Sequence, residues 1–349
     1  ADKIEVARVL SWECVVKKGE FKEGDLGVYI EIDSIVPDKP IFEFLKDKKF
    51  KVKTIRLRGQ VSQGLYLPMS YFPEIRSPKE DMDVTKLLGV TKYDPEADAE
   101  KKMFMSPKNK PWWFKYAIRI PFLRKLLIKP VGGGIAFPTH LVPKTDETRL
   151  QAFPASFLEE YAELPVSITQ KMVGSSLTII WHKNKLSVAS RNVWFPTRVA
   201  NQYWNIVDKI GFEAYLKKHH KGQSFAFQGE LCGPNIQGNK YKFSEHRLYI
   251  FGMYNIKSQM YVTAPSLRRI VEAMIEVTGS PYLFHVPILK DSIPINRIGT
   301  TVQDWLGYAT TKSLYNEETW NEGIVVRSLD DKPYGISKMN GKRFSFKVI

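Results

Sequence analysis

A lysine stands between a strand-like run and a tight turn in ITQKMVGSSL, residues 168–177. Lys171 and Gly174 have the spacing K-x-x-G, in which a sharp turn can present the lysine amine to a substrate. An unprotonated amine is a nucleophile that can form a covalent intermediate with a phosphoryl group. The same spacing occurs at Lys86, Lys129, Lys332 and Lys338. Only Lys171 follows an alternating strand and precedes a Gly-Ser-Ser turn and another strand, so context selects it.

Residues that phosphoryl chemistry needs follow in later strand-like segments. Arg191 in SRN and Lys347 in SFKVI are cations that can neutralise phosphate charge. Glu230 in FQGELCG and Glu322 in NEGIVVR are carboxylates, through which magnesium is often held. Phe251 in LYIFGMYNI can stack on a nucleobase. Each one alone reads equally well as a solvated charge or a core side chain, so the signal is the ordered set.

The elements that must position these residues are predicted from periodicity over residues 141–349. APSLRRIVEAMIEVTG predicts an amphipathic helix that Thr263 caps and Gly279 ends. TRLQAFPASFLEEYAE, residues 148–163, also has helical spacing. Strands are predicted in VSITQKMVG, SLTIIWHKNKLSVASRN, SFAFQGELCG, RLYIFGMYNI and EGIVVRS. This mixture indicates an α+β domain built on antiparallel sheet.

The preceding residues divide into two regions. Residues 1–95 hold short strands and glycine turns and predict a small β-barrel, an OB-fold or a similar SH3-like barrel. Arg56 and Arg58 in RLRGQVSQG either contact nucleic-acid phosphates or pack inside this barrel. Residues 96–140 predict a basic, aromatic linker whose rings and cations either stack on bases or dock one domain on the other.

Composition narrows the class of protein. The 349 residues predict two domains, and the net charge of +15 favours a polyanionic partner. Cys14 and Cys232 are the only cysteines, which fits a reducing compartment and excludes a cysteine-rich zinc module. The sequence contains no apolar run of about 18 residues, so no membrane-spanning helix is predicted. The chain lacks an initiator methionine and stops in strand-like alternation, so we expect both natural ends to be missing. We expect an intracellular, cytoplasmic monomer.

In order and spacing these segments resemble the nucleotidyltransferase motifs of covalent-lysine ligases and capping enzymes. GELCGPNIQ and SFKVI are most similar to RNA ligases. KTDETRLQAFP at 144–154 and KTIRLRGQVSQGLYLP at 53–68 extend the resemblance to the Naegleria type, RNA ligase family 5. The resemblance covers most of the chain and is weakest across 71–130. It implies an N-terminal OB domain followed by a nucleotidyltransferase (adenylation) domain over 141–349.

The resemblance also implies a reaction. An ATP-dependent RNA ligase would seal 3′-hydroxyl and 5′-phosphate RNA ends, in particular nicks in a duplex, through AMP on Lys171 and an adenylylated RNA 5′ end. Lys171, Glu322 and Lys347 would be catalytic, and Glu322 and Glu230 would hold Mg²⁺ or Mn²⁺. Arg56 and Arg58 would contact RNA. The residues expected around ATP are Gln170, Gly174, Ser175, Arg191, Glu230, Phe251, Arg149 and Lys144.

Four positions depart from the pattern. Val173 stands where related enzymes usually have an acidic residue, and Gln170 where glutamate is frequent. Gly252 replaces an aspartate, and Ile349 replaces a second lysine, for which Lys342 could substitute. These departures leave open a catalytically impaired RNA-binding protein on a ligase scaffold. A DNA ligase also remains open, whereas the domain order disfavours a capping enzyme.

Overall fold

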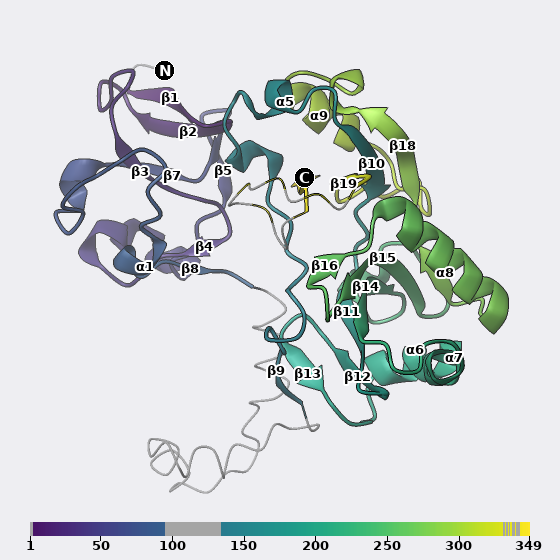
Figure 1. Cartoon of the computed structure of the whole chain (residues 1–349). Helices are drawn as coiled ribbons and strands as arrows, with labels where there is room; N and C mark the ends of the chain where they lie inside the picture. Colours follow the sequence, from purple (N-terminus) through teal and green to yellow (C-terminus); the bar gives the residue numbers. More distant parts are fainter. Residues whose placement is uncertain are drawn as a thin grey trace, which may run out of the picture. The chain divides into compact units, whose positions relative to one another are not determined.

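The computed structural model describes residues 3–94, 134–330 and 343–349, and the single positions 332, 334, 336 and 339. The chain forms two compact units (Figure 1), one of residues 1–95 with 151–155, the other of residues 96–150 with 156–349. Most of the linker predicted over 96–140 lies outside the described residues, as does Lys342. No helix in the described ranges is long and apolar enough to cross a membrane.

The first unit consists of short antiparallel pairs, β1 with β2, β3 with β7, β4 with β8 and β5 with β6. Apolar side chains of β3 and of the 3-10 helix η1, among them Val28, Ile30 and Phe42, form its core. Its elements are β1 (Ile4–Val9), β2 (Trp12–Lys17), β3 (Gly27–Ile30), β4 (Ser34–Ile35), η1 (Pro40–Lys48), β5 (Thr54–Leu57), β6 (Gln60–Gln63), β7 (Leu65–Pro68), η2 (Met69–Tyr71), α1 (Thr85–Leu88) and β8 (Thr91–Lys92).

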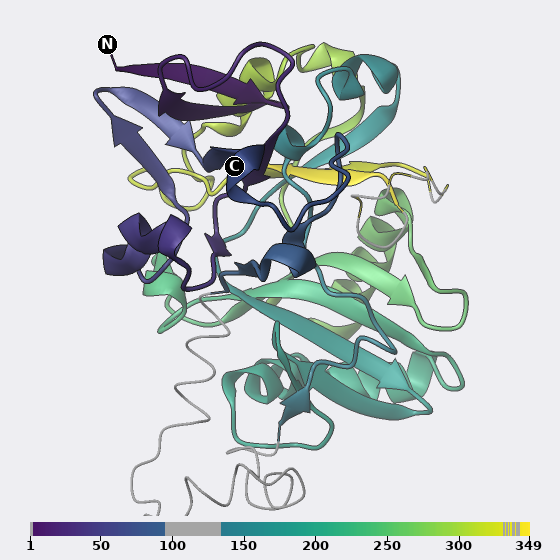
Figure 2. The same cartoon turned by 90° about the vertical axis from the view of Figure 1, so that its left-hand side faces the viewer.

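The second unit contains two sheets. Eight strands form one in the order β16-β15-β14-β11-β12-β13-β9, with β17 also paired to β15. The other has the order β18-β10-β19-β20, and the yellow strand β20 lies beside β19 (Figure 2). The strands are β9 (Ile135–Ala136), β10 (Pro165–Gln170), β11 (Ser175–His182), β12 (Lys185–Ala189), β13 (Val193–Phe195), β14 (Phe225–Cys232), β15 (Arg247–Asn255), β16 (Met260–Tyr261), β17 (Leu283–His285), β18 (Ile288–Pro294), β19 (Ile324–Ser328) and β20 (Ser345–Val348).

Helices cover one face of the larger sheet (Figure 1). The predicted amphipathic helix is confirmed as α8, capped by Thr263 and ended by Gly279. The helix predicted over 148–163 is wrong in extent, because Pro154 cannot continue a helix and only η3 and α5 form there. The helices are η3 (Leu150–Ala152), α5 (Phe157–Glu160), α6 (Gln202–Ile210), α7 (Phe212–His219), η4 (Gln237–Asn239), α8 (Ala264–Thr278), η5 (Ile295–Arg297) and α9 (Val302–Ala309).

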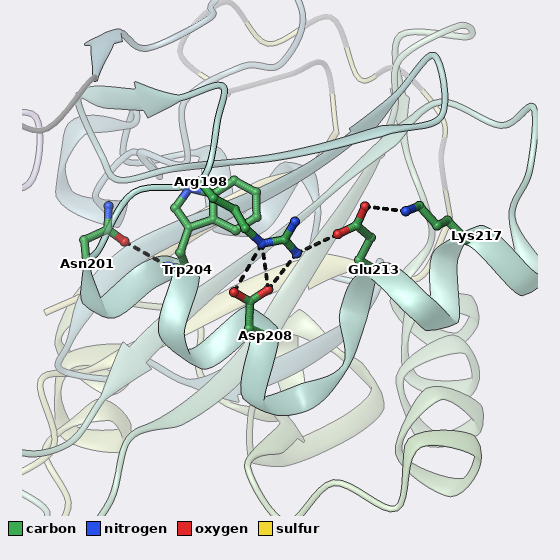
Figure 3. A network of polar contacts seen from close by, with 6 residues as sticks. All are labelled: Arg198, Asn201, Trp204, Asp208, Glu213 and Lys217. Carbon is green, nitrogen blue, oxygen red and sulfur yellow. Dashed lines mark hydrogen bonds and ion pairs between the residues drawn. The ribbon is translucent and has the colours of Figure 1, made fainter.

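An ionic network fixes α6 and α7 to the chain that enters them (Figure 3). The Arg198 guanidinium donates to Asp208 on α6 at 2.8 Å and to Glu213 on α7 at 2.6 Å. It also lies 5.0 Å from the Trp204 ring. Asn201 caps α6 by accepting a hydrogen bond from the backbone N–H of Trp204. These contacts hold the helical layer, which leaves the opposite, more polar face of the sheet for other residues.

Three short segments connect the sheets, one of them residues 286–287 between β17 and β18. Residues 171–174 join β10 of the smaller sheet to β11 of the larger one. Residues 143–149, here called the linking segment, contact both sheets. The Pro143 carbonyl accepts a hydrogen bond from Gln228 of β14 at 2.8 Å, and the Thr148 carbonyl accepts one from the Lys347 N–H of β20 at 2.8 Å.

Candidate active site

Lys171 and Glu322 are brought together by neighbouring strand ends. The β10–β19 ladder pairs Gln170 with Ile324, and one residue further the Lys171 N–H donates to the Gly323 carbonyl at 2.9 Å. The Lys171 Nζ lies 2.5 Å from Oε1 of Glu322. Both side chains are about one-third exposed, so the pair is open to a substrate. The pairing places the amine of the predicted nucleophile beside a carboxylate.

Gly174 allows the turn after Lys171 to pack closely on β14. A Cβ at Gly174 would lie 2.4 Å from the Leu231 carbonyl oxygen and 2.8 Å from Cγ of Glu230. The Val173 N–H donates to the Tyr241 hydroxyl at 2.7 Å, and the Val173 side chain packs against a cluster of aromatic rings. The position that departs from the acidic pattern is therefore part of an apolar contact.

Glu230 and Glu322 are the carboxylates available to a divalent ion. Glu230 lies opposite Ser176 in the β11–β14 ladder. Burial raises the pKa of the Cys232 thiol, and the negative charges of Glu230 and Glu322 raise it further. Among the described residues no three His, Cys, Asp or Glu side chains form a metal-binding group. Carboxylates suit Mg²⁺ or Mn²⁺, which retain waters and bind substrate phosphates.

Cations from the linking segment and the β12–β13 turn line a small cavity. Arg191 donates to both carboxylate oxygens of Asp146, at 2.9 and 3.1 Å, and Lys144 donates to the Asn192 side chain at 2.7 Å. Ser175 does not line this cavity and shares a hydrogen bond with Tyr203. The lining residues are Phe137, Lys144, Thr145, Asp146, Ser176, Thr178 and Arg191.

Lys347 faces the same side of the smaller sheet as Lys171. Val325 pairs with Thr169 on one side and with Lys347 on the other, so these three share one face. Lys171 follows Thr169 by two residues and continues that face. Arg149 forms an isolated parallel bridge with Lys347. Two predicted phosphate-binding cations are thus adjacent in backbone register.

A buried ionic cluster anchors the linking segment. Glu147 accepts from Arg327 of β19 at 3.0 Å and from Arg343 at 3.4 Å, and Ser345 donates to its second oxygen. Burial raises the pKa of Glu147, but the charges of the two arginines and the Ser345 hydrogen bond outweigh it, and the pKa lies below its ordinary value. Burial and the Arg343 charge lower the pKa of Arg327 to about 10.

Phe251 is partly buried, and Gln170 is fully buried. Phe251 is the extra residue of a β-bulge between β14 and β15, an arrangement that re-aims a side chain. Its ring lies 5.6 Å from the Arg327 guanidinium and lines a second small cavity together with Thr169. Gln170 is 1% exposed, and within the described part of the chain neither its amide oxygen nor its amide nitrogen has a hydrogen-bond partner. Such an amide is suited to a ligand that both donates and accepts.

The comparisons with known proteins agree with this geometry. An RNA ligase family model matches residues 164–349, and an OB-fold domain model matches residues 1–69. A structure of Naegleria gruberi RNA ligase with pyrophosphate is 32% identical, covers 100% of this chain and 91% of that chain, and has a TM-score of 0.78.

This chain belongs to the RNA ligase family.

Two further structures of the Naegleria gruberi RNA ligase, both of mutants, are also 32% identical and cover 100% of this chain and 92% of that chain. One is with ATP and Mn at a TM-score of 0.77, and one is with AMP and Mn at a TM-score of 0.78. No curated protein matches the chain. The predicted resemblance, the OB-fold and the α+β architecture are confirmed, and this RNA ligase is an enzyme.

Sequence reasoning about this RNA ligase missed residues that orient the predicted site. Asp146 holds Arg191, and Glu147 holds the linking segment. Both lie in KTDETR, where acidic residues read as solvated charge. Ser176 rather than Ser175 lines the Arg191 cavity, which the pairing of Ser176 with Glu230 explains. Arg56 and Arg58 are exposed and belong to the first unit.

Proposed function

We propose that this RNA ligase uses ATP to seal 3′-hydroxyl and 5′-phosphate RNA ends, with Lys171 as the nucleophile. The observation that carries the proposal is the 2.5 Å contact between Lys171 Nζ and Glu322 Oε1 at two adjacent strand ends. One proton passes from the ammonium through the Glu322 carboxylate to water, so Glu322 is ionised again. The neutral amine attacks the α-phosphorus of ATP, an N–P bond forms, the bond to the bridging oxygen breaks, and pyrophosphate leaves.

Positive side chains stabilise the charge of the triphosphate during this step. Lys347 faces the same side as Lys171, and Arg191 with Lys144 lines the neighbouring cavity. Phosphoryl transfer depends chiefly on such positioning and charge neutralisation. Asp146 keeps the Arg191 guanidinium in one orientation through two hydrogen bonds. Arg149, bridged to Lys347, belongs to the same phosphate-binding group.

The nucleoside occupies the side of the site formed by β14, β15 and the end of β10. Phe251 stacks on adenine, and the unpaired amide of Gln170 reads the edge of the base. Glu230 accepts hydrogen bonds from the ribose hydroxyls. Gly174 lets the backbone approach, because a side chain there would collide with the Leu231 carbonyl. Ser175, the first residue after this turn, also contributes to the nucleotide site.

The divalent ion, Mg²⁺ or Mn²⁺, supplies positive charge against the phosphates. Glu322 and Glu230 would hold it together with waters. The proton passes between Lys171 and Glu322, and the residues named above bind the nucleotide.

Two further steps complete sealing. The AMP moves from Lys171 to the RNA 5′-phosphate, so the N–P bond breaks and a 5′-5′ phosphoanhydride forms. The RNA 3′-hydroxyl then attacks the 5′-phosphorus, the new phosphodiester forms, and AMP leaves. The preferred substrate is a nick, the active form is a monomer, and Arg56 and Arg58 of the OB domain, residues 1–95, contact RNA phosphates.

The test is incubation with α-labelled ATP and Mg²⁺ without RNA, followed by denaturation. Wild-type protein retains label, γ-labelled ATP leaves none, and Lys171→Ala and Glu322→Gln lose the labelling. Lys86→Ala is the matched control, because Lys86 has the same K-x-x-G spacing on the exposed helix α1. Label that persists in Lys171→Ala would refute the assignment.

A second candidate is an RNA-binding protein that has lost catalysis. Val173, Gly252 and Ile349 favour it, since they replace residues that the family pattern uses for metal and phosphate contacts. RNA retention in a gel shift without any labelling of the wild-type protein would support this candidate over the ligase.

A further inference from the structure

An exposed tryptophan lies two residues before Glu322. Trp320 keeps 57% of its surface exposed and Leu314 keeps 63%, whereas tryptophan in a globular protein is usually well buried. The Lys312 ammonium lies 4.2 Å from the Trp320 ring centroid. We call Lys312, Leu314 and Trp320 the Trp320 face. It combines an aromatic surface with a cation, the pairing that proteins use to hold single-stranded nucleic acid.

The backbone that carries the Trp320 face is held in one conformation. Lys312 and Trp320 form an antiparallel bridge. The Ser313 N–H donates to the Thr319 carbonyl at 2.9 Å, and the Asn321 N–H donates to the Thr311 carbonyl at 2.9 Å. Exposed apolar residues on an ordered hairpin are preorganised for binding, because little conformational entropy is lost when they meet a partner.

The same hairpin is attached to the turn that carries the nucleophile. Tyr315 packs its ring 5.6 Å from the Tyr241 ring, and the Tyr241 hydroxyl accepts from the Val173 N–H. The Asn316 side chain donates to the Lys240 carbonyl at 2.8 Å. The Trp320 face is therefore connected to the turn that carries Lys171. The connection runs through the packed Tyr315 and Tyr241 rings and the hydrogen bond from the Val173 N–H to the Tyr241 hydroxyl.

The charges around the hairpin are mixed. Lys240 is exposed beside it, whereas Lys242 pairs with Glu318 across the junction, and Glu317 and Glu322 lie in the same segment. The cation on the face itself is Lys312, whose ammonium lies against the Trp320 ring. A protein with a net charge of +15 has the electrostatic character expected for nucleic-acid binding.

We propose that the Trp320 face stacks a nucleobase of the RNA strand close to the end being sealed, with Lys312 on the adjacent phosphate. The proposal rests on the proposed function, since it makes the face a part of the RNA site. It adds a substrate contact on the nucleotidyltransferase unit that is separate from Arg56 and Arg58. At a nick this face would hold a terminal base that has left the duplex stack, because a base within the stack cannot lie on an indole.

The test measures the affinity of a short, fluorescently labelled, 5′-phosphorylated RNA by anisotropy, with ATP omitted. Loss of one stacked base corresponds to a decrease of about 5-fold to 150-fold, and Trp320→Ala is expected within this range. Trp320→Phe keeps a ring and restores most of the affinity. Lys312→Ala lowers the slope of log affinity against log salt by about one unit. Val277→Ala is the control, because Val277 is 56% exposed on α8.

The outcomes separate this inference from the proposed function. If Trp320→Ala binds RNA within about twofold of wild type, or Val277→Ala weakens binding equally, the face has no role in RNA binding and the inference is wrong. Labelling of the wild-type protein by ATP is measured in parallel. If the wild-type protein is labelled by ATP and Trp320→Ala binds RNA normally, only the Trp320 inference is refuted. If the wild-type protein is never labelled, the proposed function is refuted, whatever the RNA affinities are. A folded state is verified for each variant by its thermal unfolding curve.

Discussion

The substitution Glu147→Gln removes the carboxylate that contacts two buried guanidinium groups. Glu147, Arg327 and Arg343 have side chains that are 9%, 8% and 13% exposed. Removing one partner of a buried ion pair leaves an uncompensated charge and costs about 3–5 kcal/mol. Since glutamine has nearly the same shape, this loss reflects charge rather than a cavity. For a unit of this size it lowers the unfolding temperature by about 6–20 °C.

The assay is thermal unfolding followed by circular dichroism, with ATP labelling measured on the same samples. Labelling is expected to fall as well, because Glu147 lies between Asp146, which holds Arg191, and Thr148, which pairs with Lys347. The matched control is Glu213→Gln, whose ion pairs are exposed and cost about 1 kcal/mol or less. A loss of under about 1 kcal/mol for Glu147→Gln would refute the reasoning that the cluster is electrostatically essential.

The same cluster sets a pH dependence. The folded-state pKa of Glu147 lies below its ordinary value of 4.5, so the ionised form is favoured by folding. This contribution to stability is fully present above about pH 4.5 and is lost as the pH falls through the folded-state pKa. Wild-type protein is therefore expected to lose more stability below pH 4.5 than Glu147→Gln, which has no carboxyl to titrate. Parallel acid-unfolding curves of the two proteins would contradict this.

Three other substitutions test separate contacts. Gly174→Ala places a methyl 2.4 Å from the Leu231 carbonyl oxygen, so the nucleophile turn must shift; we expect labelling by ATP to fall at least about tenfold, and normal rates would disprove the close packing. Tyr241→Phe deprives the Val173 N–H of its acceptor and is expected to cost about 1–3 kcal/mol in denaturant unfolding; an unchanged midpoint would show that water replaces the hydroxyl. Arg198→Ala breaks the exposed network of Figure 3, and we expect about 1 kcal/mol at low salt and almost none in 1 M salt; a loss that salt does not reduce would indicate packing instead.

The strands and the main helix were predictable because their burial follows the sequence period. VSITQKMVG alternates before Lys171. Leu267, Val271 and Met274 of the predicted helix face are buried, and Ile270 of the same face is partly buried. Strand partners were not predictable in the same way. The sequence does not state that Lys171 and Lys347 belong to one sheet and Glu230 to another, because pairing over a long separation leaves no local pattern.

Side-chain orientation limited the prediction of the site. Ser175 and Ser176 are chemically identical, and only the pairing register of β11 decides which one lines the Arg191 cavity. Glu147 looks like a solvated residue because its partners, Arg327 and Arg343, are far away in the chain. Local composition cannot reveal such a long-range ion pair.

The four-residue turn that carries Lys171 is also one of the peptide links between the two sheets of its unit. A nucleotide attached there is bonded to the backbone that joins one sheet to the other. Adenylylation would then couple chemistry to rigidity, and amide hydrogen exchange at the end of β10 and the start of β11 should slow together once AMP is attached. The covalent intermediate would thus differ from the free enzyme in the rigidity of these two strands as well as in its high-energy N–P bond.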